Sequence, residues 1–137
     1  MYEVFDHTAD LGLRVCSATL SGLMEDAAAG LMTIIAGDLG QIRRQEQQTF
    51  EVRGEDPAYL LFDWLNELLY AFEAGRMLYA AFKVRLEPEK GLVATARGER
   101  YDPERHVLAH EVKAITYHEL EVRETAAGWE GVVIVDI

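Results

Sequence analysis

The first residues with the chemistry for a functional site lie near the start of the chain, in Phe5-Asp6-His7-Thr8-Ala9-Asp10-Leu11-Gly12. Two carboxylates and an imidazole stand close together there, at a point where an apolar pattern breaks. Carboxylate oxygens bind hard cations such as calcium, and loops at strand ends often carry functional groups. Asp10 is therefore a candidate metal ligand, although an aspartate at such a position can also simply cap a turn.

A second pair of anionic groups stands at Asp136 and Ile137, where the α-carboxylate of Ile137 would follow the Asp136 side chain. If the last strand pairs beside the first strands, Asp136 comes next to Asp10. Several oxygen ligands would then surround one divalent cation. The alternative is that Asp136 is an ordinary exposed strand end.

The third cluster of charged and polar residues runs from Glu111 to Glu121. Strand alternation over this segment would place Glu111, Lys113, Ile115 and Tyr117 on one face. Lys113 is then either half of a Glu–Lys surface pair or an ammonium group presented to a partner. His118 is either a hydrogen-bonded structural residue or part of a functional surface. We expect the fold to bring all three places together.

Several kinds of chemistry are disfavoured. His7, His110 and His118 are scattered and there is no thiolate pair, so their spacing does not indicate zinc. The segment 37–40 contains two glycines but follows a predicted helix, which is the wrong side for a phosphate loop. No activated serine or cysteine is identifiable for a catalytic triad. The net charge of −11, with only 13 basic residues, disfavours tight, direct nucleic-acid binding.

Two helices with buried faces must position these groups. Apolar residues at three-and-four spacing predict a first helix from Thr19 or Ser21 to a stop at Gly37. Asp56-Pro57 marks the start of the second helix, which closes at Gly75. Its wide apolar stripe, centred on Trp64, predicts that this helix is the hydrophobic centre of the fold.

The rest of the chain consists mostly of strands and turns. The predicted strands are 1–5, 11–16, 45–53, 77–87, 92–99, 117–125 and 129–137. This order predicts a single α+β domain over residues 1–137, with a mostly antiparallel sheet and the two main helices packed on one side. A single cysteine, no long apolar run and no leader pattern predict a cytoplasmic protein without membrane contact.

Four motifs, in order and spread over essentially the whole chain, resemble the archease family. They are His7-Thr8-Ala9-Asp10-Leu11-Gly12, Asp63-Trp64-Leu65-Asn66-Glu67-Leu68-Leu69-Tyr70, Val112-Lys113-Ala114-Ile115-Thr116-Tyr117-His118 and Val135-Asp136-Ile137. Each alone is modest, but four in register are specific.

The resemblance implies a function. Archeases assist the tRNA-splicing RNA ligase, which joins RNA ends carrying a 3′-phosphate or a 2′,3′-cyclic phosphate, by promoting its guanylylation and repeated turnover. Carried over by position, Asp10, Asp136 and Ile137 would bind a divalent cation. The expected ion is Ca²⁺, with Mg²⁺ or Mn²⁺ as alternatives. Lys113, with His7 and His118, would belong to the surface that acts on the ligase.

On this interpretation the chain is a protein cofactor and has no catalytic residues of its own. Two other classes stay open. One is a metal-dependent phosphoester hydrolase using Asp10, Asp136 and a cation-bound water. The other is a chaperone-like adaptor acting through an apolar patch, without metal dependence.

Overall fold

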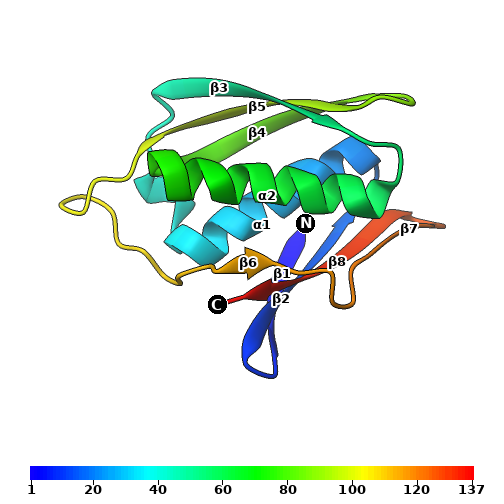
Figure 1. Ribbon diagram of the computed structural model, residues 1–137, viewed down its shortest axis with the longest axis horizontal. Coiled ribbons are helices and arrows are strands. Elements are labelled where there is room, and N and C mark those ends of the chain that lie inside the picture. The colour runs from blue at the N-terminus through cyan, green and yellow to red at the C-terminus, as the bar shows by residue number, and fades with distance from the viewer.

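The computed structural model describes residues 1–137 as two antiparallel sheets with two helices between them (Figure 1). The elements follow in the order β1 (Tyr2–His7), β2 (Asp10–Ser17), α1 (Leu20–Ala36), the short 3₁₀ helix η1 (Leu39–Gln41), β3 (Glu46–Arg53), α2 (Pro57–Gly75), β4 (Met77–Glu87), β5 (Gly91–Arg100), β6 (Ala114–Ile115), β7 (Glu121–Thr125) and β8 (Gly128–Asp136). The predicted α+β class, with two main helices and antiparallel strands, is confirmed. The division into two sheets is new, and each sheet has the helices on one of its faces.

The larger sheet is organised around β8. Its strand order is β1-β2-β8-β6, and β7 also pairs with β8, next to β6 along the same edge. The smaller sheet has the order β3-β5-β4. In Figure 1 the smaller sheet lies above the helices and the larger one below them. The core therefore fills the space between the sheets, where both helices contribute their apolar residues.

Helix α1 forms where the spacing predicts it. The Thr19 side chain caps its start by accepting a hydrogen bond from the Gly22 amide at 3.0 Å. Gly37, with φ of 79°, ends the helix in a conformation that favours glycine. There is also a structural reason for glycine at position 30, because a Cβ there would come within 2.4 Å of the Leu13 side chain on β2. The helix thus lies close against the larger sheet.

Helix α2 lies across the molecule beside α1, in the layer between the two sheets (Figure 1). Trp64 at its middle is fully buried and packs edge-on against Phe50 of β3 and Phe82 of β4. Its indole N–H donates a hydrogen bond of 3.0 Å to the Met24 carbonyl of α1. One side chain therefore joins both helices to the smaller sheet.

The start of α2 gives a first testable prediction. Asp56 accepts a hydrogen bond from the Ala58 amide at 2.8 Å, and Pro57 follows it. Replacing Asp56 with alanine removes this cap and is expected to lower the free energy of unfolding by about 1 kcal/mol. Urea denaturation measures the change. The neighbouring exposed Glu55 makes no hydrogen bond, so Glu55→Ala is the matched control and should change stability by less than about 0.5 kcal/mol.

The long connection between β5 and β6 is held down by a buried polar cluster. Glu99 accepts hydrogen bonds from the Arg43 amide at 2.6 Å, from the Arg105 guanidinium and from His106 Nε2 at 2.9 Å. The Asp102 amide donates to His106 Nδ1 at 2.9 Å, so the ring proton lies on Nε2 and is donated to Glu99. Glu99 and His106 are the two buried ionisable side chains outside the apolar core.

A second set of contacts fixes the far part of the same connection. The Gln41 side chain accepts from the Val107 amide at 2.9 Å and donates to the Val107 carbonyl at 3.0 Å. The Ala109 amide then donates to the Ile35 carbonyl at the end of α1, at 2.8 Å. The chain is thereby led to Lys113 and β6 along a defined path.

Two sequence-based expectations for this region are wrong. Residues 117–120 do not open a long strand but form a turn, and the strand β7 begins only at Glu121. Alternation around Lys113 also fails, because only Ala114 and Ile115 pair with β8. Ile115 is buried in the core while Lys113 and Tyr117, outside the paired stretch, are exposed.

No helix in the structure combines the length and apolar character needed to cross a membrane.

Candidate metal centre at the β1–β2 turn and the end of β8

The site begins at the tight turn between β1 and β2. His7 and Asp10 are directly opposite each other in the strand register, and only Thr8 and Ala9 connect them. Thr8 adopts φ of 51°, a left-handed conformation that costs a β-branched residue free energy. The turn therefore fixes His7 and Asp10 as neighbours on one face of the hairpin.

The last strand brings Asp136 to this turn. Leu11 pairs with Val135 in the antiparallel β2–β8 ladder, so Asp10 and Asp136, each next in its strand, lie side by side. Leu11 and Val135 face the core, and alternation therefore directs both aspartates to the opposite, outer face. The strand pairing expected from the sequence is confirmed; the ligand role of these residues stays a prediction.

Lys113 joins the same place through its backbone. Its amide donates a hydrogen bond of 2.8 Å to the Asp136 carbonyl, and Ala114 pairs with Asp136 in the β6–β8 ladder. The side chain of Ile137 is partly buried against the core, which anchors the end of β8. The three clusters of charged and polar residues identified in the sequence thus meet at one end of the larger sheet.

The charges at this end are unbalanced. Asp10 and Asp136 are half-buried, and neither carboxylate takes part in an ion pair or accepts a hydrogen bond. Lys113 is exposed and makes no ion pair either, so the alternative of a Glu111–Lys113 surface pair is not realised. Two adjacent carboxylates without a cationic partner are an oxygen donor set that fits a hard divalent cation.

The turn after β6 brings a second group of polar side chains to His7. Glu119, with φ of 55°, reverses the chain and directs its carboxylate back toward the hairpin. Its Oε2 lies 3.2 Å from His7 Nε2, and its Oε1 lies 3.9 Å from His118 Nε2. The His7 and His118 rings are 5.4 Å apart, edge to face. His7 and His118, far apart in the sequence, are therefore gathered in space with Glu119, while His110 is not part of the group.

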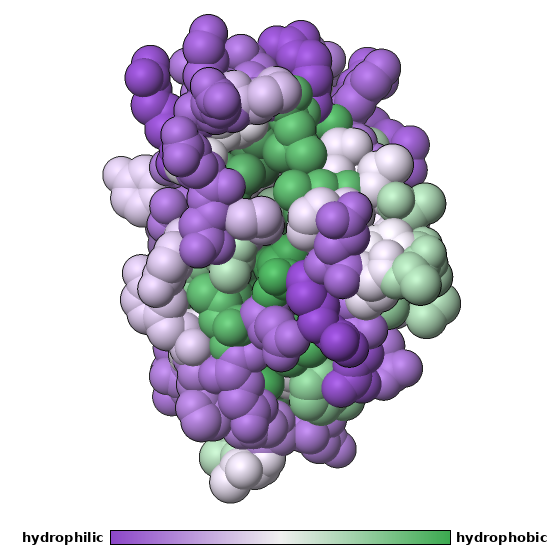
Figure 2. Space-filling model, turned by 90° about the vertical axis from the view of Figure 1, so that its right-hand side faces the viewer, coloured by the Kyte–Doolittle hydropathy of each residue, from purple (hydrophilic) through white to green (hydrophobic).

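Exposed aromatic side chains lie next to this turn. Tyr117 is 61% exposed and stacks on Phe62 of α2 with 3.9 Å between ring centroids, and Tyr59 is 56% exposed beside it. Together with Asp56 and Leu120, the two tyrosines line a shallow hollow. Figure 2 views the end of the molecule where α2 begins, and hydrophobic side chains reach the surface there inside a hydrophilic surround.

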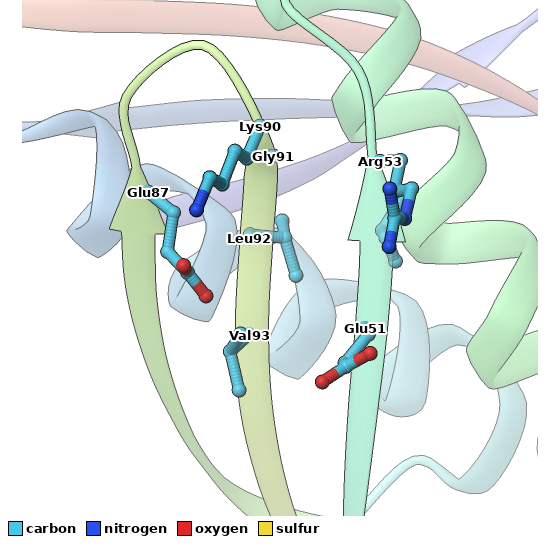
Figure 3. A pocket seen from close by; sticks show the side chains of 8 residues that line it. Glu51, Arg53, Glu87, Lys90, Gly91, Leu92 and Val93 are labelled. Atoms are coloured by element: carbon cyan, nitrogen blue, oxygen red, sulfur yellow. The ribbon is translucent and has the colours of Figure 1, made fainter.

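Another hollow, of about 340 Å³, lies at the β4–β5 turn of the smaller sheet. Figure 3 shows the Glu51 and Glu87 carboxylates on either side of Val93, with Lys90 and Arg53 above them. Acidic and basic groups are mixed there, and no group of metal-ligating side chains is present. This hollow is on the opposite sheet from β8, so it does not belong to the candidate site.

One residue of the site was missed at the level of sequence. This residue is Glu119, which follows His118 in the chain, and the expected strand over 117–125 would point the two side chains to opposite faces. The left-handed residue at 119 is what makes them neighbours. No sequence pattern indicates that a glutamate will adopt this left-handed conformation.

Comparison with known proteins identifies the family to which the chain is similar over its length. Residues 2–137 match the Archease protein family (MTH1598/TM1083). The chain is 38% identical to the protein archease of Methanosarcina acetivorans, over 99% of this chain and 95% of that one. It is also 38% identical to the protein archease of Methanopyrus kandleri, over 99% of each chain.

Two solved structures share the fold. The solution structure of protein 1598 of Methanobacterium thermoautotrophicum superposes with a TM-score of 0.83, at 31% identity over 99% of this chain and 98% of that one. A crystal structure from Thermotoga maritima, described as an archease and possible chaperone, superposes with a TM-score of 0.67 at 19% identity, over 100% and 98% of the two chains. At that identity the likeness concerns the fold alone.

Proposed function

Because this chain belongs to the archease family, we propose that it activates a tRNA-splicing RNA ligase in the cytoplasm. It promotes guanylylation of the ligase and repeated turnover on RNA ends that carry a 3′-phosphate or a 2′,3′-cyclic phosphate. In this proposal the chain does no covalent chemistry itself. Its net charge of −11 supports a role in which the RNA stays with the ligase.

The observation that carries the proposal is the meeting of Asp10, Asp136 and Lys113 at one end of the β2-β8-β6 ladder. We propose that Asp10, Asp136 and a main-chain or terminal oxygen of Ile137 hold a divalent cation, with Ca²⁺ preferred over Mg²⁺ or Mn²⁺. Support comes from the two half-buried carboxylates that have no cationic partner. The cation would neutralise these two carboxylates.

The surrounding residues form the contact surface for the ligase in this proposal. Lys113 presents an ammonium group without an ion pair from the position just before β6, where its amide is held by the Asp136 carbonyl. His7 is opposite Asp10 in the strand register, and its ring contacts that of His118. These groups would dock the chain near the ligase active site and favour the conformation that accepts the nucleotide.

Ligation by the cognate ligase tests this function. Multiple-turnover joining is measured with GTP and Mn²⁺, with and without this protein. We expect clear stimulation, and we expect Asp10→Asn and Asp136→Asn to abolish it at limiting cation, because losing a ligand lowers cation affinity by about 10- to 100-fold or more. Glu89→Gln, an exposed acid in the β4–β5 turn of the other sheet, is the matched control and should stimulate normally.

Other results of this assay would favour one of the alternative functions. Stimulation that survives both aspartate substitutions would remove the metal from the proposal. Absence of stimulation by folded protein would reject the activator role. Phosphodiester cleavage by the protein alone would then favour a hydrolase, and protection of unrelated clients without metal would favour a chaperone, as the description of the Thermotoga maritima protein suggests for that protein.

A further inference from the structure

His7, His118 and Glu119 form a group of potential metal ligands that the proposed oxygen site does not use. One ligand atom from each lies within 4.8 Å of the others. This is the one such group in the structure, and it contains neither Asp10 nor Asp136. The question is whether hydrogen bonding within the protein already explains why these side chains gather.

Hydrogen bonding does not explain it. The Nδ1 atom of His7 is buried and has no partner, the only buried side-chain nitrogen or oxygen in this condition. The contact of His7 Nε2 with Glu119 is at ion-pair distance, 3.2 Å, while the contact of His118 with Glu119, at 3.9 Å, is too long for a hydrogen bond. Buried polar atoms are normally paired, yet the protein gives His7 Nδ1 no partner, and Nε2, which faces Glu119, forms no hydrogen bond with it. The Nε2 atom is therefore the one available to a metal beside a second imidazole and a carboxylate.

The donor atoms identify that metal by their chemistry. Two imidazole nitrogens and one carboxylate suit borderline metals such as zinc rather than the hard cations that prefer oxygen alone. Two histidines and a glutamate also form a known zinc donor set, with water in the fourth position.

The spacing fits as well. Ligand atoms on a tetrahedral zinc ion lie about 3.3 Å apart, from bond lengths of about 2.0–2.1 Å. The His7–Glu119 distance of 3.2 Å already matches. The His118 side chain is 65% exposed and is free to close the remaining gap. His7 ends β1, and His118 and Glu119 lie in the turn after β6, so the ion would also tie the β1–β2 hairpin to the connection between β6 and β7.

We propose that His7, His118 and Glu119 bind Zn²⁺ at a site separate from, and adjacent to, the Asp10–Asp136 pair. His7 is directly opposite Asp10 in the strand register, so the two sites share one face of the hairpin. Their donor sets differ, which makes them selective for different metals. This proposal does not depend on the activity of any ligase.

Metal titration of the isolated protein tests it. Co²⁺ serves as the coloured probe, because its visible absorption reports nitrogen ligation, and Zn²⁺ should displace it and abolish the colour. Calorimetry with Zn²⁺ should show one ion per chain. His7→Ala and His118→Ala should each lower Zn²⁺ affinity by about 10- to 100-fold or more. Since the His118 side chain is mostly exposed, that variant is expected to fold normally, as circular dichroism will verify.

Two controls locate the ion. His110→Ala removes an exposed histidine that lies outside the group and should bind Zn²⁺ like the wild type. The double variant Asp10→Asn, Asp136→Asn should also keep the Co²⁺ spectrum. The proposal is overturned if the wild-type protein shows no saturable binding of Co²⁺ and Zn²⁺. It is also overturned if folded His118→Ala binds these ions as the wild type does, or if binding is lost only in the aspartate double variant.

Discussion

Replacing Trp64 with alanine is expected to lower the free energy of unfolding by about 3–5 kcal/mol. The side chain is fully buried and touches aromatic rings on two strands of the smaller sheet. Its removal leaves a large cavity and also deletes the hydrogen bond to the Met24 carbonyl. Because small domains are stable by only about 5–15 kcal/mol, the loss is a large share of the total. Equilibrium urea unfolding, followed by circular dichroism, measures it.

The same helix offers a matched control. Tyr70 is 69% exposed, and Tyr70→Ala should change stability by less than about 0.5 kcal/mol. Trp64→Phe keeps an aromatic ring but loses the N–H donor, so its stability should fall between those of the wild type and Trp64→Ala. A cost below about 1 kcal/mol for Trp64→Ala would contradict the packing of Trp64 against α1 and the smaller sheet.

The second large effect is expected at Glu99. Its removal in Glu99→Ala leaves the Arg43 amide and His106 Nε2–H buried without their acceptor and Arg105 without its partner. We expect a loss of about 3 kcal/mol in the free energy of unfolding. The connection that leads to Lys113 should also loosen, and faster amide hydrogen exchange across residues 101–110 would report it.

The pKa of Glu99 adds a pH dependence with a definite sign. Burial raises this pKa, but hydrogen bonds from the Arg43 amide, Arg105 and His106, with the charge of Arg105, outweigh it and lower the pKa to about 2. A carboxyl group whose pKa is lowered by folding stabilises the protein above its ordinary pKa, near 4.5. That stabilisation is lost as the pH falls from about 4.5 to about 2.

Comparison with Glu99→Gln isolates this contribution from the other carboxyl groups. The stability difference between wild type and Glu99→Gln should be constant above about pH 4.5 and should shrink toward zero near pH 2. Glu124→Gln, which changes an exposed acid on β7 that has no ion pair or side-chain hydrogen bond, should show no such trend. A difference that does not vary with pH would show that the charge of Glu99 does not stabilise the fold.

The helices and most strands could be predicted because their causes are local. Thr19 and Asp56 cap helices whose apolar spacing is clear, and Gly37 ends the first one as expected. The split into two sheets could not be predicted, because it depends on which strands pair. Nothing in β5 alone says that it pairs with β3 and β4 and not with β8.

The candidate site shows the same division. The meeting of Asp10 with Asp136 followed from charge and from the placement of both residues at strand ends, and the β2–β8 register confirms that they are neighbours. The failure at Tyr117–Leu120 has a specific cause, since one left-handed residue, Glu119, converts an expected strand into a turn. Glu99 and His106 were also missed, because their partners come from three separate segments.

The position of β8 has a consequence for how the protein is made. This strand pairs with β2, β6 and β7, yet it follows all three in the chain and therefore leaves the ribosome after them. The β1–β2 hairpin is synthesised well before β8 and must wait, with an unpaired edge, until residues 128–136 have emerged. Such distant pairing slows folding and exposes edges that aggregate. We expect ribosome-bound chains stalled before Gly128 to remain protease-sensitive, and native protection to appear only once Gly128–Asp136 is released.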